Sequence, residues 1–389
     1  MTAAVARPPA ASAYPCQAYS CAVTTLDALG QNAAAWDDLS SRSGDAHPFY
    51  SRHVMLAHRA SGLAAPDLRV VVVRFGDRLE AVLPFRRSYD ICGLGRCVSL
   101  PYLSPFITAT APLVADGPER PAILVTLVAG LAAASAGRPW RWPLLSVETS
   151  LGRDLLTAMG LAGWDVGEVA RFWRPVLQRR PDHAAFLAGH PHPSRLKDLR
   201  RRQRRIAEGG AVSLETETRG PGLARAVEVF LTVEAAGWKG AAGSAMACRA
   251  AHGTFARAVF GAGEGPVGIR ADTLRQAGTP LAVSLALVSG GTAYLLKTAY
   301  DETARAYAPG LVLEAEIVRA LHAEAFADRL DSATLAGSAL ESLYRERDAV
   351  AEIIAVPDAG RGLISLERRL RLARFEGEAR HEVRRLLRR

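Results

Sequence analysis

The sequence predicts a mixed α/β protein built from two domains of similar organisation. The chain has 389 residues, of which 49% are apolar, and this length favours two domains over one. Runs of β-branched residues bounded by turns alternate with apolar patterns of helical period, as is typical of α/β proteins. A His- and Pro-rich stretch, residues 190–193, interrupts these patterns near the middle of the chain and marks the expected boundary.

The expected first domain covers residues 23–188 and follows a lead-in, residues 1–22, that is rich in Ala and Pro. Its clearest feature is a hairpin, in which two apolar runs flank the turn Gly76-Asp77. The expected strands are 68–75, 79–85, 142–147 and 172–177, and the expected helices are 31–41, 49–58, 121–136 and 151–159.

The expected second domain covers residues 189–358. A basic helix at 195–208 begins after Ser194, a residue type suited to capping. The further expected helices are 221–236, 254–260, 311–326 and 338–347, and the expected strands are 212–217, 267–274, 281–288, 293–299, a short one from 330, and 350–356. The last part therefore reads strand, strand, strand, helix, strand, helix, strand.

A faint internal echo links the two halves. The turn Gly76-Asp77 and the turn Gly278-Thr279-Pro280 each lie in an apolar hairpin that follows two helical segments. This similarity suggests two related domains in tandem. The alternative is coincidence, because few residue types suit such turns.

The net charge of +9 is concentrated at the C-terminus. Residues 361–389 contain ten Arg and four Glu, so the tail, residues 359–389, carries most of the excess. Its apolar residues alternate with Arg, which favours a helix that lies on an anionic partner or a membrane surface. The longest apolar stretch, residues 122–136, is too short to span a bilayer, and no signal peptide is visible, so we expect a cytoplasmic protein.

Metal binding is not expected. The pairs Cys16/Cys21 and Cys92/Cys97 lie far apart in sequence and have no nearby His to complete a zinc site. His190 and His192 have no carboxylate or Cys beside them and are interpreted as part of a linker.

The segment that follows the third strand of the second domain has the features of a phosphate-binding site. Gly310 allows close approach to the backbone where a helix begins, and Pro309 sets the entry into that helix without loss of a useful N–H donor. A helix N-terminus presents unpaired N–H groups and the positive end of the helix dipole. The alternative is an ordinary Pro-Gly turn that caps a helix.

Three segments together resemble the CelD-type (cellulose-biosynthesis) acetyltransferases of the GNAT superfamily over about 170 residues. They are Gly237-Trp238-Lys239-Gly240, Leu296-Lys297-Thr298-Ala299-Tyr300-Asp301-Glu302 and Tyr307-Ala308-Pro309-Gly310. The resemblance implies two tandem GNAT-like domains, each a mixed, mostly antiparallel sheet flanked by helices. Of the Gln/Arg-x-x-Gly-x-Gly/Ala cradle common in the superfamily, only Gly310 is present.

The resemblance also implies acyl-CoA, and acetyl-CoA first, as co-substrate. Tyr307, Ala308, Gly310 and Leu311 would hold the pyrophosphate, the thioester would lie between the strand 293–299 and the strand near Leu330, and no covalent enzyme intermediate would form. The first domain would orient or cover the acceptor and would have no donor site.

Proton carriers are sought among the acids and the tyrosine nearest the expected cleft, namely Tyr300, Asp301 and Asp331. A capping role at the end of the strand is the alternative for Asp331. Lys297 would bind phosphate or stabilise the thiolate, and its alternative is a surface Lys on a strand.

Trp238 and Lys239 would line the acceptor side. The alternative for Trp238 is that it covers the core beneath a turn.

The sequence therefore predicts an N-acyltransferase acting on a small-molecule or saccharide amine, in exopolysaccharide or envelope metabolism. Two alternatives remain. Tandem GNAT-like domains also resemble the Fem-type ligases that use aminoacyl-tRNA, and the basic helix suits RNA. The other alternative is a catalytically degenerate scaffold protein of a polysaccharide-synthesis complex.

Overall fold

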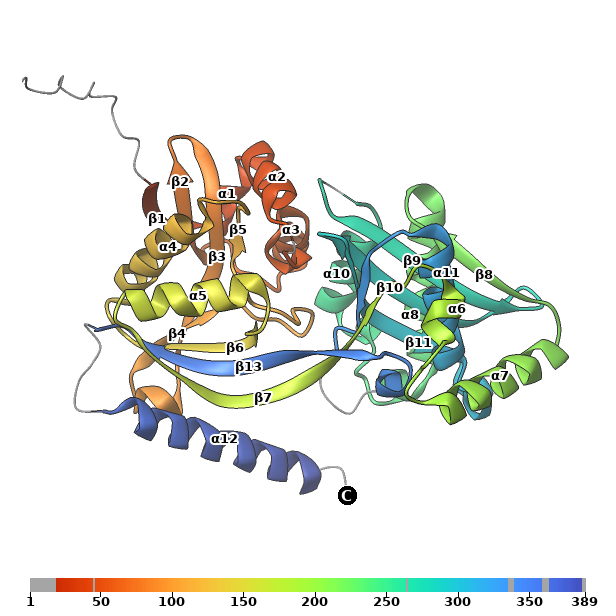
Figure 1. The fold of residues 1–389 in the computed structure, drawn as a ribbon. Coiled ribbons are helices and arrows are strands. Elements are labelled where there is room, and N and C mark those ends of the chain that lie inside the picture. Colours follow the sequence, from red (N-terminus) through yellow and green to blue (C-terminus); the bar gives the residue numbers. More distant parts are fainter. Residues whose placement is uncertain (1–18, 45, 264, 335–338, 359–363, 387–389) are drawn as a thin grey trace, which may run out of the picture.

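A computed structural model describes residues 19–386, except residues 45, 264, 335–338 and 359–363. Its two halves lie side by side and share one continuous sheet (Figure 1). Along this sheet the strands run in the order β1-β2-β3-β4-β6-β13-β7-β12-β11-β10-β9-β8, and β5 pairs with β3 outside this path.

The N-terminal half consists of one side of this sheet and five helices. Its strands are β1 (Tyr19–Thr25), β2 (Arg69–Phe75), β3 (Arg78–Tyr89), β4 (Cys97–Pro101), β5 (Leu113–Val114), β6 (Trp140–Ser146) and β7 (Asp165–Gln178). Its helices are α1 (Leu26–Gly30), α2 (Ala33–Arg42), α3 (Arg52–Ala60), α4 (Arg120–Ser135) and α5 (Ser150–Leu161), with short 3-10 turns η1 (Pro48–Tyr50) and η2 (Ile91–Gly93).

The C-terminal half repeats this organisation. Its strands are β8 (Val212–Glu217), β9 (Gly268–Gln276), β10 (Thr279–Ser289), β11 (Thr292–Tyr300), β12 (Arg329–Asp331) and β13 (Glu346–Val356). Its helices are α6 (His183–Leu187), α7 (Pro193–Glu208), α8 (Gly220–Ala236), α9 (Trp238–Ala241), α10 (Ala250–Phe260), α11 (Pro309–Glu324) and α12 (Leu366–Leu386), with 3-10 turns η3 (Met246–Cys248), η4 (Glu302–Tyr307) and η5 (Ala339–Ser342).

The two halves exchange their last strands. β13 comes from the C-terminal half but pairs with β6 of the N-terminal half, whereas the end of β7 pairs with β12. β7 and β13 also pair with each other from Glu346/Val176 to Val356/Asp165 and form the long central ribbon that joins the halves in Figure 1. Each half thus completes its sheet with a strand of the other.

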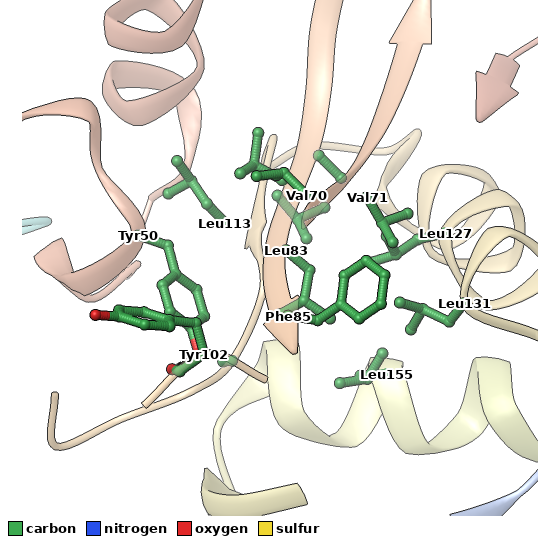
Figure 2. Close-up of a cluster of buried hydrophobic side chains, with 14 of the residues drawn as sticks. Tyr50, Val70, Val71, Leu83, Phe85, Tyr102, Leu113, Leu127, Leu131 and Leu155 are labelled. Atoms are coloured by element: carbon green, nitrogen blue, oxygen red, sulfur yellow. Dashed lines mark hydrogen bonds between the residues drawn. The ribbon is translucent and has the colours of Figure 1, made fainter. Parts of the chain in front are cut away.

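Apolar side chains fill both sides of the sheet. In the N-terminal half, Phe85 and Leu83 of β3 pack against Leu127 and Leu131 of α4, and Tyr50 and Tyr102 lie on the opposite side of the strands (Figure 2). In the C-terminal half, residues that alternate along β10 face different helices: Val283 and Leu285 contact the α8–α10 layer, and Ala282 and Ala286 contact the α7–α11 layer. This alternation places α8 and α11 on opposite faces of the sheet.

The fold class predicted from the sequence is confirmed, but some elements differ from their predictions. β1 begins at Tyr19, inside the expected lead-in, and β7 begins at Asp165 rather than at 172. The helix predicted at 338–347 was wrong, because the described part of this segment contains only the turn η5 and the start of β13. β13 begins early because it must reach β7 across the junction of the halves, a contact that local sequence patterns do not report.

The Arg-rich tail forms a helix that packs on the protein. Leu366, Leu370 and Ala373 of α12 contact a small cluster that includes Val169 and Ile354, and Glu376 pairs with Arg141 at 2.5 Å. The apolar side of the described part of α12 therefore faces the sheet. The side chains of Val383 and Leu387 lie outside the described residues.

Candidate functional site

A split in the sheet separates β11 from its neighbour β12. The two strands are parallel and pair only from Thr292/Arg329 to Tyr294/Asp331. Beyond Tyr294, no described strand pairs with this edge of β11 up to Tyr300, a length of roughly 17 Å. The backbone N–H and C=O groups along this edge are therefore available to an extended ligand that carries amide groups.

A β-bulge lies inside the split. The pairing of β10 with β11 shifts between Leu285/Lys297 and Ala286/Leu295, so that Leu296 is the extra residue. Bulges bend a strand and change the direction of its side chains. After the bulge, Thr298 faces α11, whereas Lys297 faces the α8–α10 layer.

The helix that leaves the split begins without a side-chain cap. Ala308 is the N-cap of α11 and adopts the left-handed conformation with φ +49°, and Pro309 is the first helical residue. The amides of Leu311 and Val312 both donate to the carbonyl of Ala308, at 3.0 and 3.1 Å. Among the described groups, the amide of Gly310 has no acceptor, and it stands at the positive end of a 16-residue helix.

Cationic side chains of α7 lie beside this helix start. A cavity of about 110 Å³ is lined by Ala308 and Leu311 together with Arg195 and Arg202. Arg202 is positioned by two contacts, because its Nε donates to Asp198 at 2.7 Å and its Nη1 donates to the Ala306 carbonyl at 3.0 Å. The uncapped helix start and the two guanidinium groups together favour an anion.

A second hollow borders the bare edge of β11 on the side of α8 and α9. It has a volume of about 250 Å³ and is lined by Trp238, Lys239, Tyr300 and Glu302 among others. The indole of Trp238 is 62% exposed, which does not fit the alternative that it covers the core. The structure thus brings together three of the predicted site residues, Trp238, Lys239 and Tyr300.

Lys297 lies on the same side, in an apolar setting. Its Nζ is 4.9 Å from the centre of the Phe106 ring, which belongs to the N-terminal half. Burial lowers the pKa of Lys297, the positive charge of Lys239 lowers it further, and the Glu234 carboxylate opposes both effects. Glu234 is itself held by Lys239 at 2.9 Å and by the Met246 amide at 2.8 Å. The side chain of Lys297 is therefore partly buried on the side of the α8–α10 layer.

Two of the predicted proton carriers have other partners. The carboxylate of Asp301 caps η4, where it accepts from the amide and the hydroxyl of Thr303 at 2.9 and 2.8 Å. Asp331 is 5% exposed, accepts from the Ala333 amide at 2.7 Å and lies 3.7 Å from Arg174. Because Asp331 lies opposite Tyr294, it is separated from Tyr300 by six residues of β11, or roughly 20 Å. The structure does not bring these acids together.

A buried polar cluster beneath α11 was missed by sequence reasoning. Glu314 is 3% exposed, and its Oε1 lies 3.2 Å from the hydroxyl of Thr298. The other oxygen of Glu314, the hydroxyl of Ser284 and the hydroxyl of Tyr344 are buried without hydrogen-bond partners. Burial raises the pKa of Glu314 to about 8, the Thr298 hydrogen bond opposes this shift, and Asp272 adds to it. The available signal was a single Glu on the apolar side of a helix, four residues after Gly310.

Neither metal-binding nor membrane-spanning groups are found in the part of the chain that the structure describes. Within it, no three His, Cys, Asp or Glu side chains are grouped to hold a metal ion. None of its helices combines the length and the apolar character that crossing a bilayer requires.

Comparisons with known proteins identify the domain that contains this split. The acetyltransferase (GNAT) domain family matches residues 193–335. No curated protein matches the chain.

Two solved structures share the fold. The C-terminal domain of a putative lysylphosphatidylglycerol synthetase from Agrobacterium fabrum has 14% identity and a TM-score of 0.51, and the match covers 89% of this chain and 95% of that one. FemX has 11% identity and a TM-score of 0.54, and the match covers 83% of this chain and 95% of that one. At such identities the likeness concerns the fold alone. Residues 193–335 therefore match a GNAT acetyltransferase domain of the CelD type, within a larger fold that the chain shares with these two solved structures.

Proposed function

We propose that the C-terminal half transfers an acyl group, acetyl first, from acyl-CoA to an amine. One observation carries this proposal: the bare edge of β11 leads to an uncapped helix start that is flanked by Arg195 and Arg202. The pantetheine arm of coenzyme A is extended and contains two amides, and its pyrophosphate is a strong anion. The edge offers partners for the amides and the helix start offers partners for the pyrophosphate, so the residues present fit an acyl-CoA.

This orientation fixes where the acyl group would lie. With the pyrophosphate at Gly310, the arm passes Tyr300 and Lys297 and ends where β12 resumes pairing, at Tyr294 and Asp331. The neutral amine attacks the thioester carbon, the C–N bond forms and the C–S bond breaks. The proton lost by nitrogen passes to the thiolate of the departing coenzyme A. Lys297 lies beside the arm and contributes positive charge when it is protonated, a state that its burial disfavours.

In the N-terminal half, the start of the corresponding helix, α4, does not favour an anion. α4 begins next to Glu119, a carboxylate at the N-cap position, and Arg120 is paired with Asp116 and Asp154 at 2.8 and 2.6 Å. A carboxylate at a helix start repels phosphate. This supports a single donor site, in the C-terminal half.

The CelD-type match supports an acceptor in exopolysaccharide or envelope metabolism. The FemX-like fold and the exposed cations Arg200, Arg204 and Arg205 on α7 favour one other candidate function, a transferase that uses aminoacyl-tRNA.

The test measures binding and turnover with matched variants of Gly310. A Cβ at this position meets only ordinary contacts, 3.4 Å from Tyr300 and 3.8 Å from Thr298, so Gly310→Ala should fold and bind. Gly310→Asp also suits a helix start but places a negative charge against the phosphate. At 100 times its Kd a ligand adds about 2.7 kcal/mol of stability. Acetyl-CoA should therefore raise the Tm of the wild type and of Gly310→Ala, but not that of Gly310→Asp.

Turnover is followed as thiol release from acetyl-CoA with a panel of amines. Stabilisation by tRNA in place of acetyl-CoA would move the assignment to the second candidate. If neither acetyl-CoA nor tRNA stabilises the protein, the assignment as an enzyme is abandoned in favour of a scaffold protein without catalytic activity.

A further inference from the structure

A cavity lined by both halves lies at the other end of β11. This cavity has a volume of about 340 Å³, within the range of small-molecule sites. Its wall in the N-terminal half includes His47 and the start of α5, and its wall in the C-terminal half includes Tyr294, Arg329 and Asp331. Tyr294 and Asp331 are also the last pair before the split, so the cavity adjoins the expected position of the acyl group.

His47 presents a buried donor that has no acceptor. The side chain is 8% exposed, and burial lowers its pKa to about 4, so the imidazole is neutral at physiological pH. Its Nδ1 accepts from the amide of Phe49 at 3.3 Å, which assigns the ring proton to Nε2. Nε2 has no partner in hydrogen-bonding geometry, although the nearby Ala111 carbonyl partly opposes the pKa shift.

Further donors belong to residues that line the same space. The Nε of Arg329 is buried without a partner, although the end of this guanidinium is paired with Asp348. α5 has 12 residues, its cap Thr149 serves the Gly152 amide at 3.1 Å, and its first turn contains no acid. The amides of Ser150 and Leu151 have no acceptor among the described groups, and they add the positive end of the helix dipole.

An unsatisfied buried donor is costly, so a set of them indicates a ligand that brings acceptor oxygens. A carboxylate supplies such acceptors and the negative charge that a helix start favours. The other lining cation, Arg120, is already paired with Asp116 and Asp154. The C-terminal wall also contains three carboxylates: Asp328 and Asp348 are paired with Arg179 and Arg329, and Asp331, which is closest in the sheet to the split, lies 3.7 Å from Arg174.

We infer that this cavity is the acceptor site and that the acceptor is a small amino acid. Its carboxylate lies at His47 Nε2 and the start of α5, and its amine points past Tyr294 and Asp331 to the thioester. The inference rests on the proposed acyl transfer and specifies its substrate class. The N-terminal half then has a role in catalysis, because it binds the acceptor's carboxylate.

The experiment compares amino acids with the amines that lack their carboxylate, for example lysine with cadaverine and alanine with ethylamine. Thiol release from acetyl-CoA should show at least a tenfold higher kcat/KM for the amino acid of a productive pair, as expected for the loss of a charged hydrogen-bonded group (on the order of 1.4 kcal/mol or more). Calorimetric titration of that amino acid in the presence of coenzyme A gives a readout that does not depend on turnover.

Ser150→Asp tests whether the ligand of the cavity is negatively charged where it meets the start of α5. An acid in the first turn suits α5, so the Tm and coenzyme A binding should be unchanged, whereas binding of the amino acid should fall at least tenfold. Ala34→Asp, at an exposed first-turn position of α2, is the matched control and should bind the amino acid normally. His47→Gln keeps a donor and should retain more binding than His47→Leu.

The outcomes separate the two proposals. Suppose that acetyl-CoA binds and turns over, but that simple amines react as well as amino acids or that Ser150→Asp accelerates the reaction of simple amines. The acceptor is then a cation without a carboxylate, and the amino-acid inference fails while the proposed acyl transfer stands. If acetyl-CoA neither binds nor reacts, the proposed function fails first.

Discussion

Glu314 gives the sharpest test of the energetics of this fold. Its carboxyl group is enclosed beneath α11, with one hydrogen bond to Thr298 and one oxygen without a partner. Burial raises its pKa from 4.5 to about 8, so the folded protein holds it neutral where the unfolded chain ionises it. The perturbation is Glu314→Gln, which keeps the shape and the Thr298 contact and removes the ionisation.

The direction follows from proton linkage. Below the pKa of the unfolded chain, Glu314 is neutral in both the folded and the unfolded state, so its ionisation does not affect stability. As the pH rises above 4.5, the unfolded state gains the free energy of ionisation, and the stability of the wild type falls until the folded pKa near 8 is passed. At 1.36 kcal/mol per pH unit, the wild type should lose about 3 kcal/mol relative to Glu314→Gln between pH 5 and pH 8.

Urea denaturation of both proteins at pH 5, 6.5 and 8 measures this difference. Glu208→Gln, at the exposed end of α7, controls for the loss of one carboxylate. Parallel stability curves for wild type and Glu314→Gln would refute the reasoning, because they would mean that the folded protein accommodates the charged carboxylate at no cost.

Two substitutions and one truncation test separate parts of the structure. Arg174→Met should lower the free energy of unfolding by about 3–5 kcal/mol in urea, because it leaves the buried Asp331 without its cation; a loss below 1 kcal/mol would show that this pair contributes little. Trp238→Ala should change that free energy by less than about 1 kcal/mol, since the indole is exposed. Because its hollow borders the edge of β11 proposed for the pantetheine arm, and not the acceptor side predicted from the sequence, the substitution should weaken calorimetric acetyl-CoA binding; unchanged binding would exclude this hollow from the donor site. A stop codon at residue 365 removes α12 and its Glu376–Arg141 pair and should lower the Tm by several degrees, whereas an unchanged Tm would make the helix dispensable.

Local patterns in the sequence were enough to predict the hairpins of both halves and the helix that begins at Pro309. Those elements depend on neighbouring residues: alternating apolar side chains, a turn of two or three residues, and a Pro-Gly helix start. The resemblance of the second half to a known family added the expected position of the split between the strand 293–299 and the strand near Leu330.

The remaining features depend on residues far apart in the chain. β7 and β13 pair from Glu346/Val176 to Val356/Asp165 although about 180 residues separate their centres, and no short-range pattern predicts such a partner. The same holds for the site: Asp301 and Asp331 looked equivalent as acids near a strand end, but one caps a 3-10 turn and the other faces the N-terminal half. His47 gave no signal, because its role depends on the opposite wall of a cavity formed by both halves.

The exchange of β7 and β13 between the two halves has a consequence for folding during synthesis. When the ribosome has made the first 188 residues, the N-terminal sheet still lacks the strand that belongs between β6 and β7, and that strand ends at Val356. The N-terminal half therefore stays incomplete during synthesis, with the edges of β6 and β7 unpaired, until β13 has emerged from the ribosome. Expressed alone, residues 23–188 would expose the unpaired edges of β6 and β7 and would tend to self-associate through them. The two halves could therefore be produced as separate fragments only by co-expression.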